Sequence, residues 1–188
     1  MGKLILASAS PRRSEILRSA GFPFDVFVSD ADESLPQGLS CAEAVRLLAE
    51  RKAAAVAERF PNDFVLGADT VVELDGLLLG KPKDEKEAAA MLRKLSGRVH
   101  AVHTGVCLLS PRGRLTDADR TLVEFYPLSE EEVEAYVRTG EPMDKAGAYG
   151  IQGRGALLVR RIDGDFYSVM GLPVAKVGRM LREMNCYK

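Results

Sequence analysis

One acidic residue, Asp69, lies inside a segment that otherwise resembles a buried strand. It follows the apolar run 64–68 and precedes the β-branched run 70–72, and short apolar runs of this kind are typical of buried strands. Burying a carboxylate is unfavourable unless a metal ion, a lysine or an arginine meets it, or the strand opens to solvent. Asp69 is therefore a candidate catalytic residue, the alternative being a structural Asp that caps a turn.

A lysine, Lys52, interrupts the apolar face of a predicted helix. At about 100° per residue, this face is formed by Val45, Leu48, Ala49 and Val56. A lysine there either extends its ammonium to solvent at the rim of the core, which is common for a lone lysine, or reaches an anion. A nearby Asp69 favours the second interpretation and makes Lys52 a second candidate catalytic residue.

The segment 8–13, Ser-Ala-Ser-Pro-Arg-Arg, joins a predicted strand to a predicted helix. Backbone N–H groups and the positive end of the helix dipole face outward at such a junction. Arginine side chains match phosphate oxygens two at a time. Ser8, Arg12 and Arg13 are therefore candidate phosphate-binding residues. In the alternative interpretation, Ser10 only caps the helix and the arginines are solvated.

Two further signals are weak when taken alone. Lys81 follows a predicted hairpin, in the sequence Gly-Lys-Pro, and would be presented from a stiff turn. Glu33 follows a predicted strand in a polar loop. Together with Asp69 it would supply two carboxylates for a hard divalent cation such as Mg²⁺ or Mn²⁺. The chain has only two histidines, which excludes a His-rich metal site.

The segment 144–153, Asp-Lys-Ala-Gly-Ala-Tyr-Gly-Ile-Gln-Gly, is the most unusual stretch of the chain. Its three glycines allow the backbone to approach a ligand closely. Gln152 carries both a donor and an acceptor, as the recognition of a nucleobase edge requires. Glycine-rich stretches are more often plain loops, but a plain loop needs neither the aromatic residue nor the glutamine.

Composition excludes several classes of protein. The 188 residues are 46% hydrophobic and 28% charged, with a formal net charge of −1, so nothing points to a nucleic-acid binder. We expect one soluble domain over residues 1–188, without a separate linker. The chain has three cysteines and no CxxC pair, which predicts reduced thiols rather than a disulfide framework. The first residues lack the layout of a signal peptide and no apolar run approaches membrane-spanning length, so we expect a cytoplasmic protein.

The elements that must position these residues alternate along the chain. Capping signals begin helices after Ser10, Ser40, Asp84 and Ser129, and a closing amphipathic helix covers 174–184. Asp-Gly pairs predict two hairpins, at 75–76 and at 163–164. The predicted strands are 4–7, 24–28, 65–74, 77–79, 99–109, 121–125, 156–162 and 166–170. Helices interleaved with hairpins predict an α/β or α+β protein with a mixed sheet.

Taken together, these segments resemble the Maf family of nucleoside triphosphate pyrophosphatases. The resemblance extends from segment 8–13 to Gly-Leu-Pro at 171–173 and includes Glu33, Lys52, Asp69, Lys81 and segments 96–100 and 144–153. Segment 144–153 resembles the branch acting on dTTP and UTP, whereas the branch preferring 7-methyl-GTP has a different segment there. One departure is Ser168, where many members have Asn.

The resemblance implies a fold like that of the inosine triphosphate pyrophosphatases, an elongated mixed sheet with flanking helices in two lobes around a deep cleft. It also implies a homodimer, a divalent cation and hydrolysis of a nucleoside triphosphate to the monophosphate and pyrophosphate. The residue matching Asp69 is the family's proton acceptor, and those matching Arg12, Thr70 and Gln152 govern substrate choice. The sequence leaves open whether Asp69 is a base or a metal ligand.

Two rival functions are consistent with parts of the pattern. A non-enzymatic nucleotide-binding regulator, for instance of cell division, would need the phosphate-binding segment but not Asp69. An enzyme of the same fold could act on 7-methyl-GTP or damaged purine triphosphates, which the segment 144–153 argues against.

Overall fold

The computed structural model describes residues 2–187. They form two compact units, which we call unit 1 and unit 2. Unit 1 comprises residues 2–69, 104–119 and 171–187, and unit 2 comprises residues 70–103 and 120–170. The chain passes between them within strands, so that Asp69 is the last residue of unit 1 in its strand and Thr70 is the first of unit 2.

A mixed sheet runs through the described residues, as the sequence predicted. The order of its strands is β2-β1-β3-β5-β6-β7, with β4 paired to β3. β1 pairs in parallel with β2 and β3, whereas β4 is antiparallel to β3 and β7 is antiparallel to β6. The strands are β1 (Leu4–Leu6), β2 (Asp25–Val26), β3 (Phe64–Leu74), β4 (Leu77–Leu79), β5 (Val99–Ser110), β6 (Gly113–Phe125) and β7 (Val159–Asp163).

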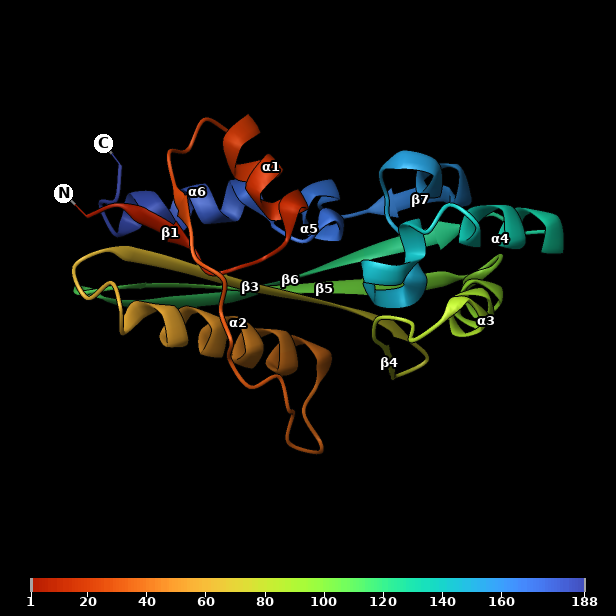
Figure 1. The fold of residues 1–188 in the computed structure, drawn as a ribbon, viewed down its shortest axis with the longest axis horizontal. Coiled ribbons are helices and arrows are strands. Elements are labelled where there is room, and N and C mark those ends of the chain that lie inside the picture. The colour runs from red at the N-terminus through yellow and green to blue at the C-terminus, as the bar shows by residue number, and fades with distance from the viewer. Residues whose placement is uncertain (1, 188) are drawn as a thin grey trace. The chain divides into compact units, whose positions relative to one another are not determined.

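Helices connect these strands. In unit 1, α2 lies on one side of the strands while α1 and α6 lie on the other (Figure 1). The α-helices are α1 (Pro11–Ser19), α2 (Cys41–Ala57), α3 (Glu85–Leu95), α4 (Glu130–Val137), α5 (Phe166–Met170) and α6 (Val174–Glu183). Three short 3₁₀ helices, which all belong to unit 2, are η1 (Glu141–Asp144), η2 (Ala146–Ala148) and η3 (Gly153–Leu158).

The helix starts confirm the local signals in the sequence. Ser40 and Ser129 each form a complete capping box with the glutamate three residues later, which satisfies two backbone donors that the helix leaves unpaired. Asp84 caps α3 by accepting a bond from the backbone N–H of Glu87. At the first predicted hairpin, Asp75 and Gly76 both have positive φ, the conformation that a two-residue type I′ turn requires.

The second predicted hairpin is wrong. Residues 156–158 belong to η3 and residues 166–170 form α5, so that only β7 is a strand in this region. The reason is a contact that the local sequence does not contain: the backbone N–H of Asp165 donates to the hydroxyl of Thr121 at 2.9 Å. The carboxylate of Asp165 then accepts from the backbone N–H of Tyr167 and begins a helix. An Asp side chain in this position favours a helix start over a strand.

The core of unit 1 forms where α2 packs on β1, β3 and β5. The buried residues of this cluster are Ile5, Ala7, Ala49, Ala53, Val56, Val65 and Cys107. The helix lies unusually close to the sheet, because a Cβ atom at Gly67 would stand 2.1 Å from the carbonyl oxygen of Ala49. Glycine is therefore required at position 67, and the close approach fixes which residues of α2 can reach β3.

No helix among residues 2–187 is both long and apolar enough to span a membrane. The three cysteines are free thiols, Cys107 and Cys186 being buried and Cys41 half-buried. Burial raises the pKa of the Cys107 thiol, as expected for a small apolar core residue rather than a reactive one.

Candidate functional site

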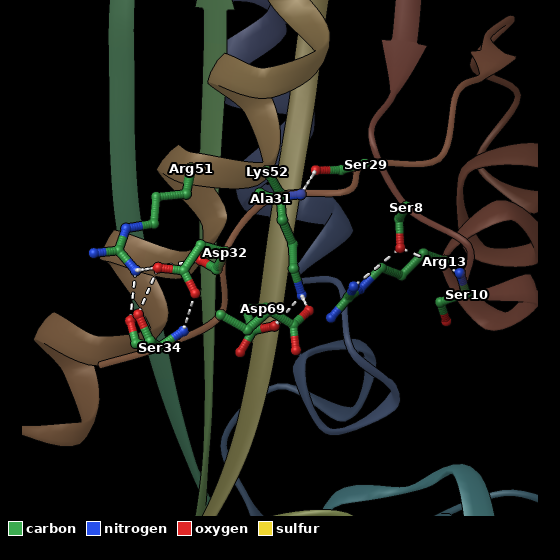
Figure 2. Close-up of polar contacts among 11 residues, drawn as sticks. Ser8, Ser10, Arg13, Ser29, Ala31, Asp32, Ser34, Arg51, Lys52 and Asp69 are labelled. Atoms are coloured by element: carbon green, nitrogen blue, oxygen red, sulfur yellow. Dashed lines mark hydrogen bonds and ion pairs between the residues drawn. The ribbon is translucent and has the colours of Figure 1, made fainter. Parts of the chain in front are cut away.

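The close packing of α2 on β3 brings Lys52 to Asp69. Gly67 and Asp69 are two residues apart in β3, so their side chains point to the same face of the sheet. Gly67 lies against Ala49 of α2, and Lys52 follows Ala49 by about one helical turn. The lysine therefore emerges beside Asp69. Figure 2 shows the Lys52 side chain descending from α2 to the carboxylate on β3.

The ammonium of Lys52 binds two carboxylates. Its Nζ lies 2.6 Å from Oδ1 of Asp69 and 2.7 Å from Oε1 of Glu33. Only 15% of the Lys52 side chain and 13% of the Asp69 side chain are exposed, compared with 65% of Glu33. Lys52 does not extend to solvent, so the interpretation in which it reaches an anion is the correct one. The sequence-predicted residues Glu33, Lys52 and Asp69 form one group within unit 1.

This group can hold a divalent cation. One oxygen of each carboxylate lies within 2.7 Å of the same ammonium nitrogen, so the two carboxylates converge on one place. Oxygen ligands of this kind suit Mg²⁺ or Mn²⁺. The donor set thus fits the expected metal, with Glu33 and Asp69 as the residues that would hold it.

The phosphate-binding segment places its two arginines differently. Arg13 is buried, and its Nε donates to the carbonyl oxygen of Gly171 at 2.8 Å while its Nη1 donates to the hydroxyl of Ser8 at 3.1 Å. The Ser8 hydroxyl also accepts from the backbone N–H of Ser10 at 3.2 Å. Arg12, in contrast, is half-buried. Arg13 and Ser8 thus bind protein groups, and their roles as phosphate ligands remain predictions.

Arg13 nonetheless contributes charge to the site. Its guanidinium points toward Asp69 in Figure 2. Burial lowers the pKa of Arg13, and the negative charge of Asp69 opposes that shift, with a smaller contribution from Glu33. The first turn of α1 therefore presents a buried cation, Arg13, to the same carboxylates that Lys52 binds. Ser10 begins α1 but makes no side-chain capping bond, contrary to the interpretation in which capping is its only role.

Comparison with known proteins identifies the family. The sequence matches the Maf-like protein family over residues 3–184. The chain belongs to this family.

Several relatives of this Maf-like chain carry the name dTTP/UTP pyrophosphatase. The Bacillus velezensis protein is 55% identical over 183 residues, covering 97% of each chain. That of Geobacillus sp. is 53% identical and covers 98% of this chain and 100% of its own. That of Symbiobacterium thermophilum is 54% identical, with 98% and 95% covered. Among solved structures, the Staphylococcus aureus Ham1 protein aligns with 65% of this chain and 71% of its own, at 16% identity and a TM-score of 0.47.

The remaining predicted site residues, Thr70, Lys81 and Gln152, belong to unit 2 of this Maf-like fold. Thr70 follows Asp69 in β3 and is half-buried, while Lys81 and Gln152 are exposed. Two sequence motifs meet here, because the backbone N–H of Gly147 donates to the carbonyl oxygen of Gly80 at 3.0 Å. The turn that carries Lys81 is thereby tied to the glycine-rich segment 144–153.

Tyr149 serves the core rather than a ligand. Its hydroxyl lies 2.7 Å from Nε2 of His100, and its ring packs edge-on against His100 and Phe125. Burial raises the pKa of Tyr149 and lowers that of His100 to about 4, so both side chains are neutral at pH 7. The aromatic residue of segment 144–153 therefore anchors the segment, whereas Gln152 is exposed near its end.

The sequence reasoning missed Arg51. Its Nη1 donates to the carbonyl oxygens of Asp32 at 3.2 Å and Ser34 at 2.5 Å (Figure 2). These carbonyls lie on either side of Glu33, so Arg51 holds the loop that carries Glu33. Lys52, the next residue in α2, binds the Glu33 carboxylate itself. The one available signal was a second cation adjacent to Lys52 in the predicted helix.

Proposed function

We propose that this chain hydrolyses dTTP and UTP to the nucleoside monophosphate and pyrophosphate. The observation that carries the proposal is the group formed by Glu33, Lys52 and Asp69, in which a largely buried ammonium binds two carboxylates. It occurs in a chain that is 53–55% identical to proteins named dTTP/UTP pyrophosphatase over nearly its whole length. The reaction makes the chain a hydrolase that acts on an acid anhydride.

The residues of the group have complementary roles in this reaction. Asp69 orients the attacking water and accepts its proton, and Oδ1 is already held by Lys52. The ammonium of Lys52 stabilises negative charge that builds up on the phosphoryl oxygens in the transition state. Arg12 and Lys81 add positive charge for the triphosphate. A divalent cation, when bound to Glu33 and Asp69, supplies further charge neutralisation.

Gln152 accounts for the choice of base. Its amide can donate to O4 and accept from N3–H of thymine or uracil. Cytosine presents a donor at C4 and an acceptor at N3, so the same amide orientation meets two mismatches. A site that depends on hydrogen bonds rejects such analogues strongly, because buried polar groups are left without partners.

A substrate panel tests the proposal. Pyrophosphate release would be measured at fixed Mg²⁺ with dTTP, UTP, CTP, GTP and 7-methyl-GTP, and again after removal of the metal by EDTA. We expect dTTP and UTP to give the highest kcat/KM and EDTA to abolish turnover. Release of pyrophosphate from 7-methyl-GTP alone would assign the chain to the other branch, and release from none would favour a binding protein. Light scattering on the same sample tests whether the chain forms the homodimer that the family resemblance implies.

A further inference from the structure

Gln152 stands at the tip of a closed turn formed by residues 150–155, which we call the Gln152 turn. The two ends of the turn are in backbone contact, because a Cβ atom at Gly155 would lie 2.1 Å from the carbonyl oxygen of Gly150. Only glycine allows the chain to close so tightly. Gln152 itself is exposed, so the turn presents this side chain outward while its base is buried.

The base of the Gln152 turn is held by two side chains that lie outside it. The backbone N–H of Gly150 donates to the hydroxyl of Tyr136 in α4 at 3.0 Å. On the other side of Gln152, the backbone N–H groups of Arg154 and Gly155 donate to Oε1 and Oε2 of Glu141 in η1, at 3.2 and 3.3 Å. A carboxylate accepts such a pair of donors with both oxygens, and hydrogen bonds to a charged acceptor are the stronger kind.

These two side chains support the same turn. Tyr136 is buried, and burial raises the pKa of its hydroxyl to about 12, with the charge of the Glu141 carboxylate contributing in the same direction. The hydroxyl therefore keeps its proton at pH 7 while it accepts from the backbone N–H of Gly150. Lys145 completes the support, since its Nζ donates to the carbonyl oxygen of Glu141 at 2.5 Å.

We propose that Glu141 and Tyr136 are positioning residues for base selection, which hold the backbone of the Gln152 turn so that the Gln152 side chain reaches the base from one fixed position. This inference rests on the proposed function. A glutamine on a mobile turn could approach uracil and cytosine from different positions and fit either. Discrimination therefore requires that its backbone be fixed and its reach limited. Tyr136 and Glu141 provide that restraint from both sides of Gln152.

The test is the substitution Glu141→Gln. The amide has nearly the same shape as the carboxylate but only one acceptor oxygen, so one of the two N–H groups of the turn faces an NH₂ group instead. We expect the ratio of kcat/KM for UTP to kcat/KM for CTP to fall about tenfold, which corresponds to about 1.4 kcal/mol. We expect kcat for UTP to change by less than this ratio, because the catalytic carboxylates are untouched.

Two further variants control the experiment. Tyr136→Phe removes the acceptor for Gly150 while it keeps the ring in the core, and we expect it to lower the same ratio. Glu131→Gln alters an exposed glutamate of α4 that forms no hydrogen bond or ion pair with the turn among residues 2–187, and we expect no change. A UTP-to-CTP ratio that stays at the wild-type value in both Glu141→Gln and Tyr136→Phe, with both variants folded, would overturn the inference.

A measurement without substrate separates this inference from the proposed function. Amide hydrogen exchange at Arg154 and Gly155, followed by NMR, reports how firmly the turn is held. We expect faster exchange in Glu141→Gln than in the wild type and in Glu131→Gln. If the wild type releases no pyrophosphate, the proposed function is wrong. Unchanged exchange at both amides would show instead that Glu141 does not hold the turn.

Discussion

In unit 1 the proposed catalytic side chains contact one another directly, whereas in unit 2 the Gln152 turn is held through its backbone. Lys52 binds Asp69 and Glu33 side chain to side chain, from a regular helix, a regular strand and one loop. The Gln152 turn is irregular. Its supports, Tyr136 and Glu141, accept hydrogen bonds from backbone N–H groups of the turn. We therefore expect the chemistry of the first region to depend on charge and the selectivity of the second to depend on hydrogen bonds from a fixed backbone. Substitutions should separate the two.

The largest effect is expected from Asp69→Asn. The amide keeps the shape of the side chain but cannot accept a proton from water, and loss of a general base lowers turnover about 10²–10⁴-fold. The loss should be the same for UTP, dTTP and CTP, because the proposed role of Asp69 is to act on the attacking water and not on the base. Pyrophosphate release under saturating substrate measures it.

A matched control for this variant exists in the same unit. Asp25 also pairs with a lysine, Lys3, at 3.2 Å, but the two side chains are 62% and 75% exposed. Exposed pairs of this kind contribute little, so Asp25→Asn should leave turnover and stability unchanged. Near wild-type turnover in a folded Asp69→Asn variant would make Asp69 a structural residue and remove the proposed mechanism.

The next effect is that of Lys52→Met. Methionine keeps the apolar stem but removes the ammonium, so we expect kcat/KM to fall about 10²–10³-fold for all pyrimidine triphosphates. The part-buried carboxylate of Asp69 loses its partner, which costs about 1–3 kcal/mol of unfolding free energy. Chemical denaturation measures that cost, and Lys3→Met is the exposed control. An unchanged kcat/KM would return Lys52 to a purely structural role.

The two regions also differ in what their sequences reveal. Lys52 and Asp69 lie in elements with periods of about 3.6 and 2, so their faces could be assigned and their meeting anticipated. The mixed sheet, the capping boxes and the first hairpin follow from equally local signals. The supports of segment 144–153 could not be anticipated, because Tyr136 and Glu141 precede it in sequence and its backbone is irregular, with positive φ at Gly147 and Ala148.

The wrong second hairpin has the same cause. An Asp-Gly pair predicts a turn from local preference alone, but the fate of the chain after Gly164 is decided by a bond from Asp165 to Thr121, more than forty residues earlier. Arg51 was missed for a related reason, since its acceptors are backbone carbonyls, which every residue carries and no residue type marks. Sequence patterns locate charged side chains better than they locate the backbone groups that those side chains bind.

A smaller effect concerns pH and the anchor of segment 144–153. His100 is buried against Tyr149, and its pKa is lowered from 6.5 to about 4. The unfolded chain therefore binds a proton below about pH 6.5 that the folded chain does not bind until about pH 4. The unfolding free energy that the neutral His100 contributes is therefore fully present above pH 6.5. Up to about 3 kcal/mol of it is lost as the pH falls toward 4.

The variant His100→Gln isolates this contribution from the other titrating groups. It should be less stable than the wild type at pH 7, because the amide packs less well against Phe125 and Tyr149. The difference in unfolding free energy should shrink as pH falls from 7 to 4, since only the wild type has this histidine to protonate. Urea denaturation at several pH values provides the comparison, and a difference independent of pH would contradict the prediction.

The smallest effect, and the most specific, is that of Gln152→Glu. A carboxylate cannot donate to O4 of uracil but can accept from the amino group at C4 of cytosine, so the ratio of kcat/KM for UTP to that for CTP should fall about tenfold. Because Gln152 is exposed, stability should not change, and kcat at saturating UTP should change less than it does in Asp69→Asn.

The decisive comparison is with Glu141→Gln. Both variants should lower the ratio of kcat/KM for UTP to that for CTP, but only Glu141→Gln should speed amide exchange at Gly155. If Gln152→Glu leaves the ratio unchanged while Glu141→Gln lowers it, the turn selects the base through a group other than the Gln152 amide. The groups to test would then be the exposed side chain of Arg154 and the backbone N–H and carbonyl groups of the turn, which are all that its glycines can offer a base.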